Sequence, residues 1–165
     1  MESPPLVICN TTPVINFAET GRLDVLAELF GEVVLPRAVV QELTAKRHRF
    51  PAAAAAWRSV PFRVMEVPDG SADRYLGATL HPGECACLAL AAAAPNSLLI
   101  LDDVAARDAA GVSGCAVTGT LGCLLEAKKA GIIAAVAPLL DALALRARFW
   151  TSKPLRAAVL RTAGE

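Results

Sequence analysis

The feature of this sequence that most restricts its fold is a short apolar segment followed at once by a helix start. Leu6–Cys9 is apolar at every position, and the lack of alternation predicts a strand that is covered on both faces. The run ends at a polar turn, in which Thr12 followed by Pro13 predicts an N-cap with proline at the first helical position. A buried strand that leads directly into a helix is the unit from which parallel sheets are built.

The same alternation of strand and helix continues along the chain. Further strands are expected at 32–35, 62–67, 98–101 and around 116–117. Helices are expected at 22–30, 36–46, 51–57, 84–94, 102–110, 121–130, 136–148 and 154–163, with Thr120 as the cap before 121. Residues 68–82 are expected to be the least structured. Because strands alternate with helices, the sequence predicts an α/β fold with βαβ crossovers and a mainly parallel sheet.

Size and composition exclude several classes of protein. A length of 165 residues suits one domain, so we expect a single domain over residues 1–165 with a loose N-terminal tail at 1–5. Sixteen Lys and Arg balance sixteen Asp and Glu, which argues against a wholly basic surface that coats duplex nucleic acid. The 55% of hydrophobic residues exclude disorder. No apolar run reaches the roughly 18 to 20 residues of a membrane span, and no secretory signal is visible.

The five cysteines indicate a reducing environment. They are odd in number, lie in apolar stretches and form no CxxC pair, which is typical of buried, reduced thiols. A structural zinc site at His81 and Cys85 is the weaker alternative, because Cys85 and Cys87 would point to different sides of a helix. We therefore expect a cytoplasmic protein.

Polar residues gather where the predicted strands end, which is where parallel sheets bind ligands. Asn10 follows the first strand, Asp102 and Asp103 follow the strand at 98–101, and Thr120 follows the last strand. Glu84 opens a helix after Pro82-Gly83, and Glu42 lies within a helix. Neither a nucleophile paired with a base nor a glycine-rich phosphate loop is present. Oxygen ligands of this kind suit Mg²⁺ or Mn²⁺.

Each of these residues also has a purely structural interpretation. Asp102, Asp103 and Glu84 have the types and positions of helix caps and first-turn acids, which a helix N-terminus favours. Glu42 has the pattern of a solvated helix residue. The basic cluster at 46–49 either complements a helix C-terminus or contacts phosphate beside the crevice, and Arg107 has the same two interpretations.

The order of the motifs resembles that of PIN-domain proteins, and more narrowly the short branch related to VapC-type toxin ribonucleases. The segments that carry the resemblance run from about residue 6 to the closing RTAGE, and they are CNTTPVINFAETGRLDVLAELFGEVVLP, LHPGECACLALA, LLILDD and TGTLGCLLEAKKAGII. The resemblance implies a three-layer α/β/α sandwich around a parallel sheet of about five strands. It also implies cleavage of single-stranded RNA that depends on Mg²⁺ or Mn²⁺.

Carried onto this chain, the four acidic positions of the family fall on Asn10, Glu42, Glu84 and Asp102. Asn10 departs from the family pattern, because an aspartate is expected there. Its amide oxygen can ligate a hard cation, but it brings no negative charge and cannot act as a base. Asp103 is a neighbouring carboxylate that could compensate.

The resemblance also assigns roles to individual residues. Glu42, Glu84 and Asp102 are the expected catalytic residues, and the expected metal ligands are Asn10, Glu84, Asp102 and Asp103. Thr12 matches the family's hydroxyl position near the metal, and Thr120 matches the one that opens the late helix. Apart from the resemblance, the phosphate-contact interpretation of the basic residues makes Arg47, Arg49 and Arg107 the expected RNA contacts.

Two classes of function stay open at this point. The first is a metal-dependent endoribonuclease, the toxin-like component of a toxin–antitoxin pair, with a homodimer and a small antitoxin-like protein as expected partners. The second is a catalytically silent PIN-like module, with Asn10 in place of the usual aspartate, that binds RNA or a protein. A small-molecule site in the same crevice is a further alternative.

Overall fold

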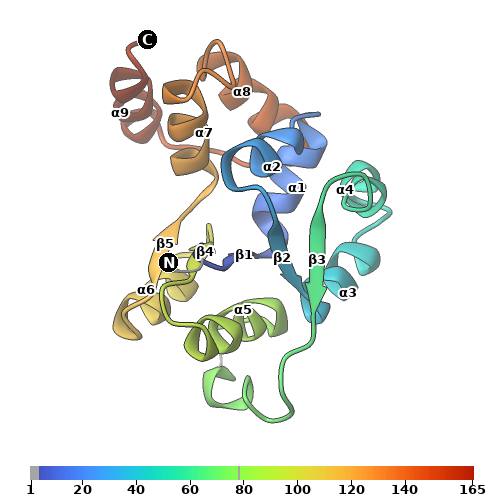
Figure 1. Ribbon diagram of the computed structural model, residues 1–165. Helices are drawn as coiled ribbons and strands as arrows, with labels where there is room; N and C mark the ends of the chain where they lie inside the picture. Colours follow the sequence, from blue (N-terminus) through green and yellow to red (C-terminus); the bar gives the residue numbers. More distant parts are fainter. Residues whose placement is uncertain (1–3, 78) are drawn as a thin grey trace.

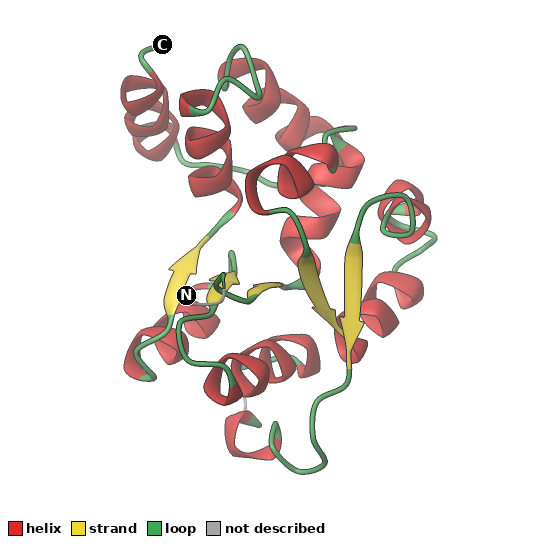
Figure 2. Cartoon of the chain, viewed as in Figure 1, coloured by secondary structure: helices red, strands yellow, loops and turns green. Residues whose placement is uncertain are grey.

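A five-stranded, all-parallel sheet forms the centre of the molecule (Figures 1 and 2). The computed structural model describes residues 4–77 and 79–165. The strands stand in the order β3-β2-β1-β4-β5, and their bounds are β1 Val7–Cys9, β2 Val33–Pro36, β3 Phe62–Met65, β4 Leu98–Ile100 and β5 Ala116–Thr118. The predicted α/β class and the parallel sheet of about five strands are confirmed.

The first strand lies in the middle of this sheet. β1 pairs with β2 through Ile8 and Val34, and with β4 over its whole length, from Val7 opposite Leu98 onward. All three residues of β1 are buried, which is why the run is apolar without alternation. Because the strand order reverses between β1 and β4, the crevice expected in such sheets opens beyond the ends of these two strands.

Helices cover both faces of the sheet and make the three layers that the resemblance implied (Figure 1). In this view α5 and α6 lie below the sheet, and α1, α2 and α7 lie above it. The bounds are α1 Thr11–Glu19, α2 Asp24–Phe30, α3 Arg37–Ala45, α4 Pro51–Ala56, α5 Pro82–Ala93, α6 Val104–Val112, α7 Thr120–Lys129, α8 Ala137–Ala142 and α9 Lys153–Ala163.

The predicted caps or first residues of α1, α6 and α7 need correction. α1 begins at Thr11 with Asn10 as its N-cap, so Thr12 is the second helical residue and not the cap. α7 begins at Thr120 itself, after Gly119 as N-cap, so Thr120 does not precede the helix. α6 begins at Val104, because the side chain of Asp103 accepts a hydrogen bond from the backbone N of Ala106 at 2.9 Å and so caps the helix.

Two segments contain short elements that the sequence pattern did not predict. The expected loop at 68–82 contains a 3₁₀ turn, Asp73–Tyr75 (η1), and the beginning of α5. The single helix expected at 136–148 is α8 followed by a π-helix, Leu143–Ala147 (η2), which ends where Arg148 adopts a left-handed conformation with φ 57°. Of the predicted tail at 1–5, residues 1–3 lie outside the described part, and residues 4 and 5 are exposed.

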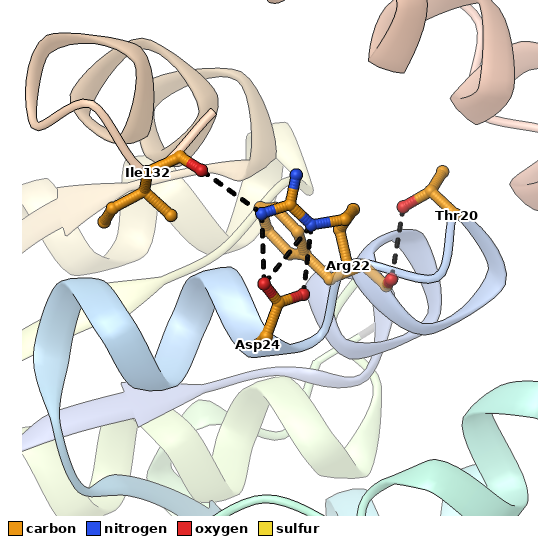
Figure 3. Close-up of polar contacts among 5 residues, drawn as sticks. Thr20, Arg22, Asp24 and Ile132 are labelled. Atoms are coloured by element: carbon orange, nitrogen blue, oxygen red, sulfur yellow. Dashed lines mark hydrogen bonds and ion pairs between the residues drawn. The ribbon is translucent and has the colours of Figure 1, made fainter. Parts of the chain in front are cut away.

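Polar contacts fix the turn between α1 and α2 against the connection from α7 to α8 (Figure 3). Arg22 donates to the carboxylate of Asp24 at 3.0–3.3 Å, and its Nη2 donates to the carbonyl oxygen of Ile132 at 3.4 Å. The hydroxyl of Thr20 donates back to the carbonyl oxygens of Asn16 and Phe17. The start of α2 is therefore tied to residues more than a hundred positions later in the chain.

The cysteines and the helices have two further features. All five cysteines are free thiols, and four of them are buried in the core. In the described residues, 4–77 and 79–165, no helix has both the length and the apolar character that crossing a membrane requires.

Candidate functional site

Glu42 of α3 is held in a fixed position between α1 and α5. Its Oε2 accepts a hydrogen bond from the hydroxyl of Thr11, and its Oε1 accepts one from the backbone N of Gly83 at 2.8 Å. A Cβ at Gly83 would lie 2.8–2.9 Å from the carboxyl atoms of Glu42, so only glycine allows this approach. Because both oxygens are bound, Glu42 is not the freely solvated helix residue of the structural interpretation.

Glu84 is a buried first-turn residue of α5. Only 5% of it is exposed, and its Oε2 accepts a hydrogen bond from the backbone N of His81 at 2.8 Å. Burial raises the pKa of Glu84, the bond from His81 opposes this shift, and the negative charges of Asp103 and Glu42 add to it. The helix-cap interpretation of Glu84 is therefore correct. However, the side chain is buried near the carboxylates of Asp103 and Glu42, and both the burial and these negative charges disfavour its ionised form.

Asn10 presents a buried oxygen that has no partner. The residue is 4% exposed and stands at the N-cap of α1, yet its side chain makes no capping bond. Its Oδ1 accepts no hydrogen bond within the described residues. Leaving a buried acceptor unsatisfied costs about 1–3 kcal/mol, so such an atom calls for a specific explanation. A ligand with positive charge would supply one.

These residues surround one pocket of about 250 Å³. It opens where β1 ends and where α3 and α5 approach α1. Its lining contains side-chain oxygens of the kind that ligate cations, together with two basic side chains. The lining residues are Asn10, Thr11, Thr12, Glu42, Lys46, His81 and Glu84. The structure thus brings together three of the four positions that the resemblance selected, with Thr12 beside them.

Asp102, the fourth position, lies between α1 and α7. It accepts hydrogen bonds from the hydroxyl of Thr120 at 2.6 Å, from the backbone N of Thr120 at 2.8 Å and from the amide of Asn16 at 3.2 Å. Burial raises the pKa of Asp102, while the bonds from Thr120 and the charge of Arg107 oppose the rise. Gly119 permits this packing, because a Cβ there would lie 2.8 Å from Asp102 Oδ1.

The pocket residues around Asn10 and the contacts of Asp102 are connected through the backbone where β1 and β4 end. The backbone N of Asn10 donates to the carbonyl oxygen of Ile100 at 3.1 Å, which fixes the end of β1 beside the end of β4. Within 4–77 and 79–165, no three His, Cys, Asp or Glu side chains are placed to hold one metal ion. A cation at this edge would therefore depend on amide and hydroxyl oxygens as well as on carboxylates.

The predicted RNA-contacting arginines are dispersed. Arg47 donates to the carbonyl oxygen of Thr44, and Arg49 stacks over the ring of Phe50 at 5.1 Å. Neither lines the pocket, whereas Lys46 of the same basic cluster does. Arg107 donates to the carbonyl oxygen of Leu101 at 3.0 Å beside Asp102, and it lines a second pocket.

Sequence reasoning missed three residues that organise this edge. Thr11 orients Glu42, and the amide of Asn16 donates to both Asp102 and Thr120 Oγ1, the latter at 2.9 Å. His81 was considered only as a zinc ligand, but it lines the pocket. One signal existed for Asn16, which is a polar residue inside the apolar stretch at 14–18 and is therefore buried with a partner.

The fold and the polar crevice beyond β1 and β4 define an α/β protein with a parallel sheet and a polar site where its strand order reverses. A family model described as a PIN domain matches residues 6–165, so the chain belongs to the PIN-domain family. The resemblance to PIN domains that the sequence carried is thereby confirmed over nearly the whole chain. Among curated proteins, none matches this sequence significantly.

Proposed function

We propose that this protein is a metal-dependent endoribonuclease that hydrolyses phosphodiester bonds of single-stranded RNA. The observation that carries the proposal is Asn10, whose buried Oδ1 has no hydrogen-bond partner in the described residues and which lines the same pocket as Glu42 and Glu84. Membership of the PIN-domain family supports the nuclease class and RNA as the substrate. We further propose that residues 6–165 act as one domain, in the role of the toxin-like component of a toxin–antitoxin pair.

The donor set fits Mg²⁺ or Mn²⁺ because it consists of oxygen atoms. Asn10, Glu84 and Asp102 would hold the ion, with Asp103 next to Glu84, and Asn10 would supply the neutral ligand. Such an ion, when bound, lowers the pKa of water and neutralises negative charge on a phosphodiester.

The residues of the chain supply orientation and proton transfer. Thr11 and Gly83 fix the carboxylate of Glu42, so it can orient a water molecule without losing side-chain entropy in the reaction. Burial raises the pKa of Glu84 as long as no cation is bound, so a cation that neutralises this carboxylate would be favoured there, and Glu42 is the residue that would accept a proton from the water. Lys46 and Arg107, on the two pockets of this edge, offer positive charge to phosphate groups.

One observation favours the second candidate, a catalytically silent PIN-like module that binds RNA or a protein. Asn10 replaces an expected aspartate, and the three hydrogen bonds to Asp102 already satisfy much of that carboxylate. The site therefore has less free negative charge than four acidic positions would give.

Cleavage of a quenched fluorescent single-stranded RNA separates the two candidates. The endoribonuclease should cleave it with Mn²⁺ and not with EDTA, and Glu84→Gln should abolish the activity. Asn10→Asp should bind Mn²⁺ more tightly and cleave faster, since it adds a carboxylate at an unpartnered buried position. If neither the present sequence nor Asn10→Asp cleaves RNA, and Asn10→Asp binds Mn²⁺ no better, the silent module is the correct candidate.

We also propose that the protein self-associates and that a small antitoxin-like protein binds over the crevice. Large apolar side chains remain on the surface, among them Val112 at 92% exposure and Leu145 at 79%. Light scattering at micromolar concentration should give about twice the chain mass of 17.2 kDa. A single species of one chain mass would contradict the homodimer.

A further inference from the structure

The carboxylate of Asp102 is held by two neutral side chains and one backbone group. Asn16 of α1 donates from Nδ2 to Asp102 Oδ2 at 3.2 Å, and the hydroxyl of Thr120 donates to the same oxygen at 2.6 Å. The backbone N of Thr120 donates to Asp102 Oδ1 at 2.8 Å. The three residues belong to the segments that follow β1, β4 and β5, which are neighbours in the sheet. The sheet therefore brings three distant parts of the chain to one carboxylate.

Asn16 also determines the direction in which Thr120 donates. Its Nδ2 lies 2.9 Å from Thr120 Oγ1, and an amide N–H can only donate, so the hydroxyl oxygen accepts from Asn16. The single hydroxyl hydrogen of Thr120 is then directed to Asp102 Oδ2. Hydrogen bonds in such a chain polarise one another, so the amide also strengthens the bond that Thr120 makes. Without the amide, the rotation of this hydroxyl is no longer fixed.

Asn16 lies at a position where the surrounding pattern is apolar. It is 1% exposed, and the other residues of 14–18 are buried and apolar. Burying an amide costs free energy unless it is hydrogen-bonded, and within the described part of the chain the Nδ2 of Asn16 donates only to Asp102 and Thr120. Because the amide is neutral, it holds the carboxylate without cancelling its charge. Among the described residues Asp102 forms no ion pair, and Arg107 donates to a backbone carbonyl instead.

The donors leave one oxygen of Asp102 with a position to fill. A carboxylate has about four positions for partners, two on each oxygen. Oδ2 accepts from both Asn16 and Thr120, whereas Oδ1 accepts only from the backbone N of Thr120. Gly119 keeps the space beside Oδ1 open, because a Cβ there would lie 2.8 Å from this oxygen. Asp102 and Gly119 both line a pocket of about 420 Å³, through which a ligand can reach this side of the carboxylate.

We infer that Asn16 is a positioning residue of the candidate site: together with Thr120 it occupies Asp102 Oδ2 and leaves Oδ1 as the oxygen that binds a cation. The choice of a cation as the ligand rests on the proposed function. The positioning does not, because the hydrogen bonds of Asn16 are made within the chain. Asn16 acts only through Asp102 and touches neither the cation nor RNA.

Binding of Mn²⁺ alone, measured by titration calorimetry without RNA, tests this inference. Asn16→Leu removes the amide but keeps a side chain of similar length. It should weaken Mn²⁺ binding by about 10- to 100-fold, the usual loss when the hydrogen-bond partner of a metal ligand is removed. Asn16→Ala, which cannot overfill the site, is a second variant and should have the same effect. Circular dichroism on heating confirms that each variant is folded.

Thr20→Val is the matched control. Thr20 is also buried and polar and stands at the end of the same helix, but its hydroxyl donates to carbonyl oxygens of α1 and not to Asp102. The variant should lower Tm and leave the Mn²⁺ affinity unchanged. If it weakens Mn²⁺ binding as much as Asn16→Leu does, the effect comes from a less stable α1, and the inference is wrong.

Thr120→Val shows whether Asn16 acts on the same oxygen as Thr120. If it does, the double variant Asn16→Leu/Thr120→Val should bind Mn²⁺ little more weakly than the weaker of the two single variants, because either change already frees Oδ2. Losses that multiply would show that the two residues act independently and would overturn the inference.

Crystal structures of the unchanged protein and of Asn16→Leu, both grown with EDTA, test the positioning without a cation. In the variant, Asp102 should lose its bond to the hydroxyl of Thr120, and if this bond persists the inference is wrong. If the bond is lost but Mn²⁺ binds the variant as tightly as the unchanged protein, Asp102 Oδ1 is not the ligand and the inference is also wrong. If the bond is lost and even the unchanged protein binds no Mn²⁺, the positioning by Asn16 is supported and the metal-dependent function fails.

Discussion

Gly83→Ala should destabilise the protein, although alanine is normally favoured over glycine in a helix. A Cβ at position 83 would lie 2.8–2.9 Å from the carboxyl atoms of Glu42, so that carboxylate has to move away. It then loses its bonds to the backbone N of Gly83 and to the Thr11 hydroxyl. At about 1.5 kcal/mol for each bond to a charged group, the loss is about 3 kcal/mol.

The gain in helix propensity offsets part of this loss. Alanine in place of glycine contributes at most about 1 kcal/mol in a helix, and less in the first turn. The free energy of unfolding should therefore fall by about 2 kcal/mol. For a chain of this length each 1 kcal/mol shifts Tm by about 2–4 °C, so the expected decrease is about 4–8 °C.

Gly111→Ala is the matched control, because Gly111 lies in α6 and a Cβ there meets no atom within 4 Å. It should raise Tm by about 1–4 °C, the gain in propensity alone. Both variants are measured by circular dichroism on heating, without and with Mn²⁺, and Gly83→Ala should also lose part of the stabilisation by Mn²⁺. If Gly83→Ala raises Tm as much as Gly111→Ala does, Glu42 is not fixed at this position and the description of the site is wrong.

Four further predictions concern the polar contacts. Thr120→Val removes the hydroxyl that donates to Asp102 and should lower the free energy of unfolding in urea by about 1–3 kcal/mol, whereas Thr120→Ser, which keeps the hydroxyl, should lose less than about 1 kcal/mol; a larger loss for Thr120→Ser than for Thr120→Val would assign the effect to the methyl group. Burial raises the pKa of Glu84 and of Asp102, so their ionised forms oppose folding at neutral pH, and stability should be held or rise slightly as pH falls toward about 5. Backbone N–H donors at the start of α8 lower the pKa of Glu165 to about 2, so the stability that its carboxylate contributes should be lost as pH falls from about 4.5 to 2. Glu165→Gln should therefore reduce the decrease of Tm over this pH range. An unchanged decrease of Tm in the variant would exclude the contact. Arg22→Met should cost less than about 1 kcal/mol, because the ion pair of Arg22 is partly exposed, and a larger loss would show that its bond to the α7–α8 connection dominates.

The sequence predicted the sheet well because burial on both faces leaves an unmistakable pattern. Each of the strands β1, β2 and β4 is a short run of apolar residues with no alternation, and the ends of such strands necessarily meet at one edge. The location of the candidate site followed from this geometry. That is why Asn10 and Asp102, almost a hundred residues apart, could be assigned to the same edge.

Helix starts and the arrangement of the acids could not be predicted in the same way. Capping depends on which backbone donor a side chain reaches: Asp103 accepts from the backbone N of Ala106 in the helix that follows it, whereas Asp102 accepts from the backbone N and the hydroxyl of Thr120 at the start of α7. The orientation of Glu42 depends on the absence of a Cβ at Gly83, a contact between residues 41 positions apart. No local pattern contains that information.

The central position of β1 has a consequence for synthesis of the protein. The strand that must pair on both sides is made first, but one of its neighbours, β4, begins 91 residues after Val7. At a synthesis rate of about 5–20 residues per second, roughly five to twenty seconds pass between the synthesis of β1 and that of β4, and during this time one edge of β1 is unpaired. Pairings over such sequence distances also close slowly, because loop entropy must be lost first. A chain halted before Leu98 therefore presents an apolar strand with free backbone groups, and such edges are the sites at which nascent chains aggregate.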